Sequence, residues 1–274
     1  MKVCFYGTRG SCPTPGPLTL KYGGNTACTL VESKNGNKLI LDAGTGIRNL
    51  GNELVKSKDN IYLLITHNHY DHIQGFPFFK PIYQKNRKIQ IYPAVTQPNH
   101  PHAIIDQMQG SYSPINHDLL TADIKFHLPD WSNQPISING FKVSRLEMNH
   151  PNGGMSYLVE VDGKRIAYVT DNELHGPNCV TSELQWSTFV SGVDLLIHDG
   201  QYIESDMPLK IGWGHSLISE SIALAQGANV KNLAIYSHDP ERTDEELDRW
   251  QNKIDELKLD FNVFISIENQ EINI

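Results

Sequence analysis

Short apolar runs rich in β-branched residues recur along the whole chain, separated by polar or glycine-containing segments. Runs of this length and composition predict β-strands. Asp162-Gly163 lies between two of them and supplies the positive φ angles of a two-residue turn, so we expect a β-hairpin there. The expected strands are residues 2–6, 28–32, 38–41, 61–65, 89–92, 141–148, 156–161, 165–169, 193–197, 232–236 and 262–265.

Apolar residues spaced three or four apart predict helices at residues 46–55, 101–109, 215–225 and 243–257. Thr243 is the expected N-cap of the last helix, because acidic residues follow it in the first turn. Many strands with interspersed helices predict an α/β fold of packed sheets flanked by helices. We expect a single domain over residues 1–274, with a loop-rich insertion at residues 94–139 on the substrate side.

The composition is that of a globular protein, with 39% hydrophobic and 20% charged residues. A formal net charge of −8 argues against a protein that grips long nucleic acid, but not against a small phosphorylated ligand held by metal ions. No apolar run approaches the ~20 residues that cross a bilayer, and Gly7, Gly10 and Pro13 come too early for a signal peptide. The cysteines lack the spacing of a metal site, and the expected location is the cytoplasm.

A dense group of potential metal ligands follows the apolar run at residues 61–65. Imidazole and carboxylate ligands together favour zinc, manganese or iron over calcium or magnesium. So many desolvated imidazoles would be costly without a ligand, which argues against a purely structural role. The members of this group are His67, His69, Asp71 and His72.

Three other predicted strands are each followed by a residue of the same kind: His150, Asp171 and His238. A single histidine or aspartate at a strand end is weak evidence of a site. In an α/β sheet, however, strand ends converge on one edge, where reactive side chains can meet on a rigid frame. We therefore expect the three residues to join the first group.

Seven candidate ligands are more than one tetrahedral ion uses, and they leave positions for water on two ions. Two ions about 3.5–4 Å apart can share a hydroxide and hold the attacking and leaving oxygens of a displacement. A bound metal lowers the pKa of water to about 7, so a nucleophile exists at neutral pH without a protein base. The sequence predicts two divalent ions, with zinc as the first choice and manganese or iron as the next.

Residues 67–72, HNHYDH, resemble the HxHxDH signature of the metallo-β-lactamase superfamily of metal-dependent hydrolases, and Asp42-Ala43-Gly44 resembles the segment that precedes it. The resemblance spans residues 2–238 and implies an αββα sandwich of two mixed β-sheets flanked by helices, with the metals at one edge. It also implies the distribution of the ligands: one ion on His67, His69 and His150, the other on Asp71, His72 and His238, and Asp171 as the bridge. Asp71 is counted as a catalytic residue as well as a ligand.

The C-terminal third resembles the phosphodiesterase branch of this superfamily, which includes tRNase Z and bacterial cyclic-nucleotide phosphodiesterases. In that branch an extra histidine beside the metals, matched here by His215, is thought to protonate the leaving oxygen. The chain differs from tRNase Z because nothing resembles its long tRNA-grasping arm and because the chain is acidic. Both differences favour a small diester. The segments that carry the resemblance are Gly7-Thr8-Arg9-Gly10-Ser11, Gly212-Trp213-Gly214-His215-Ser216 and Ser237-His238-Asp239-Pro240.

Other residues receive supporting roles. Asp42 is expected either to orient a histidine by a hydrogen bond or to form a turn before Gly44. His198 and Asp199 follow a predicted strand and are expected to support the ligands. The tryptophans are assigned to packing.

The leading hypothesis is a dinuclear metal phosphodiesterase. It would hydrolyse a small phosphodiester, a cyclic mono- or dinucleotide, by attack of a metal-bound hydroxide, with His215 protonating the leaving 3′ oxygen. A second hypothesis is an acyl hydrolase for a lactam, lactone or thioester, although such enzymes do not need the His215 segment. A third is a non-catalytic nucleotide-binding or sensor domain, which full retention of the ligands disfavours, and a fourth is a mono-iron sulfur oxygenase, which metal stoichiometry would decide. The expected partner is the small substrate, without long nucleic acid or membrane, and a homodimer stays open.

Overall fold

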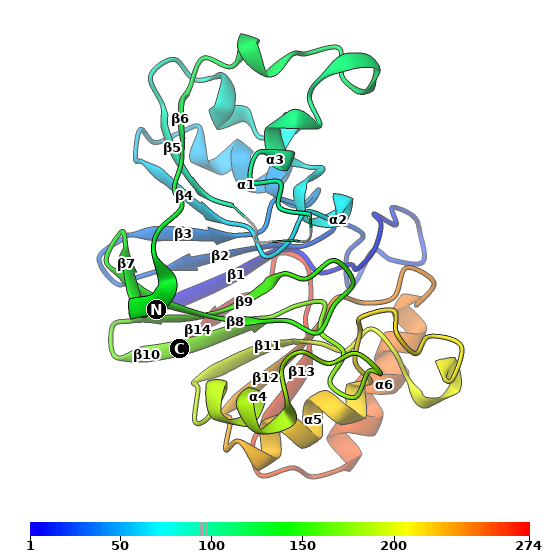
Figure 1. The fold of residues 1–274 in the computed structure, drawn as a ribbon. Helices are drawn as coiled ribbons and strands as arrows, with labels where there is room; N and C mark the ends of the chain where they lie inside the picture. The colour runs from blue at the N-terminus through cyan, green and yellow to red at the C-terminus, as the bar shows by residue number, and fades with distance from the viewer. Residues whose placement is uncertain (94–95, 97) are drawn as a thin grey trace.

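The computed structural model describes residues 1–93, 96 and 98–274. Two mixed sheets of seven strands each form its centre, in the orders β14-β1-β2-β3-β4-β5-β6 and β13-β12-β11-β10-β9-β8-β7 (Figure 1). The strands are β1 Lys2–Gly7, β2 Cys28–Glu32, β3 Lys38–Leu41, β4 Ile61–Leu64, β5 Lys88–Tyr92, β6 Asp123–Phe126, β7 Ile136–Ile138, β8 Phe141–Glu147, β9 Met155–Val161, β10 Lys164–Val169, β11 Leu195–Asp199, β12 Asn232–Tyr236, β13 Asn262–Ile265 and β14 Glu271–Asn273.

Helices cover the outer face of each sheet, with α1 to α3 beside the first and α4 to α6 beside the second (Figure 1). Phe5, Tyr168 and Tyr236 belong to a buried apolar cluster contributed by strands of both sheets, and two further clusters lie between the sheets and their helices. The predicted αββα sandwich is confirmed. The α-helices are α1 Ile47–Leu54, α2 Tyr70–Ile73, α3 Ala103–Asp106, α4 Glu183–Phe189, α5 Ile218–Gly227 and α6 Asp244–Glu256, and the short 3₁₀ helices are Phe76–Phe78, Lys80–Tyr83, Gly110–Tyr112, His117–Leu119, Trp131–Asn133 and Glu204–Asp206.

All eleven predicted strands are present, and most begin and end within two residues of the predicted limits. β9 and β10 pair as the expected hairpin, with Asp162 and Gly163 at positive φ. The pattern does not predict three short edge strands, β6, β7 and β14. Two of these lie within the predicted insertion at residues 94–139, which therefore supplies an edge strand to each sheet; residues 94, 95 and 97 of that segment lie outside the described residues.

The helices are predicted less completely. Thr243 caps α6, where its side chain accepts a hydrogen bond from the N–H of Glu246 and the Glu246 side chain accepts one in return. The helix expected at residues 101–109 has only one α-helical turn, α3. The one-turn helix α2 and the seven-residue helix α4 escape prediction because neither has enough turns to show a helical period.

Strand direction determines which edge carries the polar residues. β3, β4, β5 and β6 run parallel to one another, as do β10, β11, β12 and β13. A bridge between Arg9 and His238 joins the segments that follow β1 and β12, so the ends of these strands lie at a shared edge of the two sheets. Within the described residues, no helix is both long enough and apolar enough to span a membrane.

Candidate metal centre

Three histidines form the first group of donor atoms at this edge. His69 Nδ1 lies 3.0 Å from His67 Nε2 and 3.0 Å from His150 Nε2. His67 and His69 follow β4, and His150 follows β8, so two sheets contribute to the group. Burial lowers the pKa of all three imidazoles, that of His150 to about 4, so they are neutral at pH 7 and can offer lone pairs.

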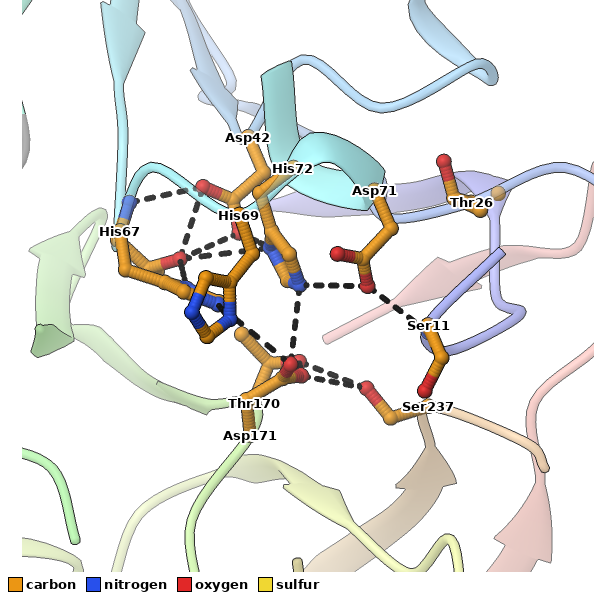
Figure 2. A network of polar contacts seen from close by, with 12 residues as sticks. Ser11, Thr26, Asp42, His67, His69, Asp71, His72, Thr170, Asp171 and Ser237 are labelled. Atoms are coloured by element: carbon orange, nitrogen blue, oxygen red, sulfur yellow. Dashed lines mark hydrogen bonds and ion pairs between the residues drawn. The ribbon is translucent and has the colours of Figure 1, made fainter. Parts of the chain in front are cut away.

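The second group adds two carboxylates. His72 Nε2 lies 3.2 Å from an oxygen of Asp71 and 3.2 Å from an oxygen of Asp171 (Figure 2). The same Asp171 oxygen lies 3.6 Å from His67 Nε2 and 3.9 Å from His150 Nε2. Burial alone would raise the pKa of Asp171, but His72 and the neighbouring histidines hold it well below its usual range. This carboxylate therefore stands between the two groups, where the resemblance implies a bridge.

Asp42 fixes the orientation of His72, one of the two roles expected for it. His72 Nδ1 lies 2.8 Å from Asp42 Oδ2, which directs Nε2 of the ring towards Asp171. The buried carboxylate also accepts hydrogen bonds from the N–H of Thr66 at 2.8 Å and from the hydroxyl of Tyr168 at 3.1 Å. Burial by itself would lower the pKa of His72, yet Asp171, Asp71 and Asp42 outweigh it and raise that pKa well above its ordinary value.

Asp71 is held by the N-terminal segment that follows β1. The N–H of Ser11 donates to Asp71 Oδ2 at 2.9 Å (Figure 2). That segment is fixed by Arg9, whose buried guanidinium donates to the carbonyls of Gly23 and Asp239. The sequence marks residues 7–11 only by resemblance and gives them no role. It does not single out Arg9, because nothing in the chain near it shows that it is buried.

His215 lies beside both groups. Its Nδ1 is 2.5 Å from Oδ2 of the buried Asp199, and its ring centroid is 5.3 Å from that of His150. Burial alone would lower the pKa of His215, but Asp199 and the other carboxylates raise it to about 9. Burial raises the pKa of Asp199, while the neighbouring His215 acts to lower it. His215 is thus a protonated imidazole beside the neutral imidazoles of His67, His69 and His150.

Two predicted residues lie apart from these groups. In the described part of the chain, donor atoms within 4.8 Å of one another form three groups: His67, His69 and His150; His67, His72 and Asp171; and His150, Asp171 and His215. None of them includes His238, and Asp71 joins them only through its 3.2 Å contact with His72. His238 Nε2 instead lies 2.8 Å from the carbonyl oxygen of Ser266, and its buried Nδ1 has no hydrogen-bond partner among the described residues. Its role as a ligand stays a prediction. His198 contacts the carbonyl of Asp199 and Ser221 rather than any predicted ligand.

A cavity of about 430 Å³ opens over the donor atoms. His69, Asp71, Asp171 and His215 line it, together with Trp213. The assignment of the tryptophans to packing is right for Trp186, which is fully buried, and wrong for Trp213, which is 56% exposed.

A family model described as a β-lactamase superfamily domain matches residues 37–238, more than half of the chain. The chain belongs to this superfamily. Ribonuclease Z of Picrophilus torridus is 24% identical over 100% of this chain and 96% of its own length. The metallo-β-lactamase-fold protein YhfI of Bacillus subtilis superposes with a TM-score of 0.69 at 17% identity, covering 99% of both chains. A diphosphatase of the PhnP family gives a TM-score of 0.67 at 16% identity over 100% of this chain and 97% of that protein. The predicted superfamily and the prediction of a metal-dependent hydrolase are confirmed.

The metallo-β-lactamase fold implies divalent metal ions, and the donor atoms fit them. Ligands 2.0–2.1 Å from a tetrahedral zinc ion lie about 3.3 Å from one another. The distances from His69 Nδ1 to His67 Nε2 and to His150 Nε2 are both 3.0 Å, close to that spacing. Neutral imidazoles whose ring nitrogens converge in this way can direct their lone pairs at a single cation. The histidine and carboxylate donors suit zinc, manganese or iron alike.

Proposed function

We propose that this protein is a dinuclear metal-dependent phosphodiesterase that hydrolyses a small phosphodiester, a cyclic mono- or dinucleotide. The observation that carries the proposal is the position of His215 beside the donor groups, where it contacts Asp199. An imidazole whose pKa is raised to about 9, held by Asp199 at the edge of the donor groups, is a ready general acid. An alkoxide leaving group, such as a ribose 3′ oxygen, needs such an acid because it is strongly basic.

The proposed division of ligands follows the two groups of donor atoms. His67, His69 and His150 would hold one ion, Asp71 and His72 the other, and Asp171 would touch both. His238 would complete the second set through its unpartnered Nδ1. When bound, two divalent ions supply an activated water and neutralise charge on the phosphate.

Each supporting residue then has a task in the reaction. Asp42 holds His72 with its Nε2 directed inward. The Ser11 N–H holds Asp71, for which we also propose a catalytic role, through one of its oxygens. Asp199 holds the proton-bearing ring of His215, which donates its proton to the departing oxygen.

The cavity and the charge support a small substrate. A space of about 430 Å³ is of the order of a single nucleotide. The net charge of −8 disfavours a long polyanion. The relatives named above include a ribonuclease and a diphosphatase, both of which cleave phosphorus–oxygen bonds, and their activities lend support to phosphorus as the centre of attack.

We also propose a single domain, in which residues 94–139 form one wall beside the substrate. His69 and Asn68 share a cavity of about 260 Å³ with Thr96 and His100 of that segment, which supports this placement. The four cysteines are free thiols, which supports a reducing compartment, the cytoplasm. No membrane or long nucleic acid is proposed as a partner, and a homodimer stays open.

The test is a substrate panel on protein reconstituted with zinc or with manganese. The panel holds cyclic mononucleotides, cyclic and linear dinucleotides, bis-p-nitrophenyl phosphate, a precursor tRNA, a β-lactam and a thioester. Hydrolysis of a cyclic nucleotide with the highest kcat/KM supports the proposal. If the lactam or thioester is preferred, the protein is an acyl hydrolase and the proposal is wrong. If the precursor tRNA is preferred, the substrate is not a small phosphodiester. Binding without turnover would indicate a sensor domain.

A further inference from the structure

Trp213 is an exposed aromatic residue at the metal centre. The residue lies two positions before His215 and lines the same cavity of about 430 Å³. Its side chain is 56% exposed, whereas Trp186 is fully buried. A large apolar ring that stays in water beside a site is a feature that a ligand can use.

The backbone around Trp213 is fixed, so its exposure is built into the fold. The two oxygens of Glu173 accept hydrogen bonds from the N–H groups of Gly212, at 2.8 Å, and Gly214, at 3.0 Å. Both glycines have positive φ, and a Cβ atom on Gly214 would lie 2.1 Å from His150 Nδ1. The carbonyl of Gly214 lies 2.9 Å from that same nitrogen. The loop that presents the ring is therefore tied directly to a predicted metal ligand.

The surroundings of the ring favour a flat, uncharged partner. Lys210 Nζ lies 4.2 Å from the centroid of the Trp213 ring, so a cation lies over the indole, and the residue is still 56% exposed. Among the described residues that line this cavity there is no lysine or arginine. Beyond the donor atoms, the lining of this cavity therefore offers a substrate aromatic stacking on Trp213 as well as polar contacts.

We propose that Trp213 is the surface on which the nucleobase of a nucleoside phosphodiester stacks while its phosphate lies at the metal centre. This inference rests on the proposed function and assigns a residue to the recognition of the base of its nucleotide substrate. Tyr70, 70% exposed on α2, lines the same cavity and offers a second aromatic ring. Aromatic rings stack on any base, so the residue confers preference for nucleotides without reading their sequence.

The experiment compares a substrate with and without its base. Wild type, Trp213→Ala and Trp213→Phe are assayed, with metal content checked, on cyclic 3′,5′-AMP and on the cyclic 3′,5′-phosphate of 1-deoxyribose. For Trp213→Ala we expect KM for cyclic AMP to rise about 10- to 100-fold, with kcat nearly unchanged. KM for the abasic analogue should stay within about threefold, and Trp213→Phe should retain most of the affinity because a ring remains.

Fluorescence gives a second readout. Binding of 5′-AMP to the zinc-loaded protein should quench tryptophan emission, and Trp213→Phe should remove that quenching. Trp250→Phe is the matched control, because Trp250 also has a lysine 4.1 Å from its ring centroid but lies on α6. It should leave the quenching intact.

Three outcomes for Trp213→Ala overturn the stacking role while the proposed function stands. An equal change in KM for both cyclic phosphates would indicate a role in loop structure. An unchanged KM for both would show that the ring contacts no base, and a change in oligomeric state alone would assign the ring to a contact between copies. If wild type cleaves neither cyclic phosphate but hydrolyses the lactam or thioester, the proposed function itself fails.

Discussion

Replacement of His215 by alanine separates the phosphodiesterase from an acyl hydrolase. Because the neighbouring carboxylates raise the pKa of His215 to about 9, the ring is mostly protonated at pH 7. If the proton goes to the leaving oxygen, His215→Ala should slow cleavage of a cyclic nucleotide by roughly 10² to 10⁴, the usual effect of a positioned acid. Bis-p-nitrophenyl phosphate should suffer far less, because nitrophenolate is stable enough to leave without a proton.

The measurement is the ratio of the two losses in kcat/KM, with metal content determined on the same samples. His175→Ala is the control, since His175 is half-exposed and pairs with Glu220. Asp199→Asn removes the charge that raises the pKa of His215, so burial then acts to lower it. Because the acid must be protonated, activity on the cyclic nucleotide should decline at a lower pH than in wild type. An equal loss of kcat/KM on both substrates in His215→Ala would refute the role of His215 as an acid. So would an Asp199→Asn variant whose activity declines at the same alkaline pH as that of wild type.

Three further predictions concern the metal centre and its support. Asp171→Asn should abolish activity almost completely and lower the bound metal below two ions per chain while circular dichroism stays native; turnover by the folded variant would show that Asp171 is not the bridge. Since burial lowers the pKa of His67, His69 and His150, that of His150 to about 4, their neutral, ligating forms persist as pH falls from 6.5 towards 4. The zinc ion held by these three residues should therefore be lost on dialysis only below about pH 5, and half-loss of that ion near pH 6.5 would contradict this. Glu173→Gln removes one of the two charge-assisted hydrogen bonds that hold Gly212 and Gly214, each worth about 1.5–3 kcal/mol, and should lower Tm and raise KM for the nucleotide. Replacement of the exposed Glu183 by glutamine is the control, and equal changes in the two variants would show that Glu173 does not fix the loop.

The strands and the order of the ligands can be predicted because each depends on a local pattern. Apolar runs mark the strands, and the residues that follow them mark the edge where strands converge. The edge strands β6 and β14 escape prediction because they are short, and the few side chains in each are only partly buried or exposed, so their sequences lack an apolar run. Their pairing depends on neighbouring strands far away in the sequence.

The supporting contacts of the site can be predicted only in part. Asp42 can be linked to a histidine because it precedes the ligand motif, but its bonds to Thr66 and Tyr168 join three strands. Glu173 cannot be identified at all, since its partners Gly212 and Gly214 are about forty residues away and carry no side chains. The exposure of Trp213 likewise follows from the path of the loop between Gly212 and Gly214 and not from its residue type.

A residue with a positive φ angle follows each of three strands whose ends lie at the site. Asp42, Asp171 and Ser237 follow β3, β10 and β12, and their φ angles are 62°, 50° and 58°. A non-glycine residue in this conformation costs roughly 1–2 kcal/mol, and the cost is smallest for Asp because its short polar side chain can bond locally. The Ser237 hydroxyl and the Thr170 hydroxyl, at 2.9 and 2.6 Å, both donate to Asp171 Oδ1 and so leave its other oxygen facing the histidines. The turn that ends each strand thus directs a polar side chain to the shared edge, and the surrounding hydrogen bonds offset the strain of that turn.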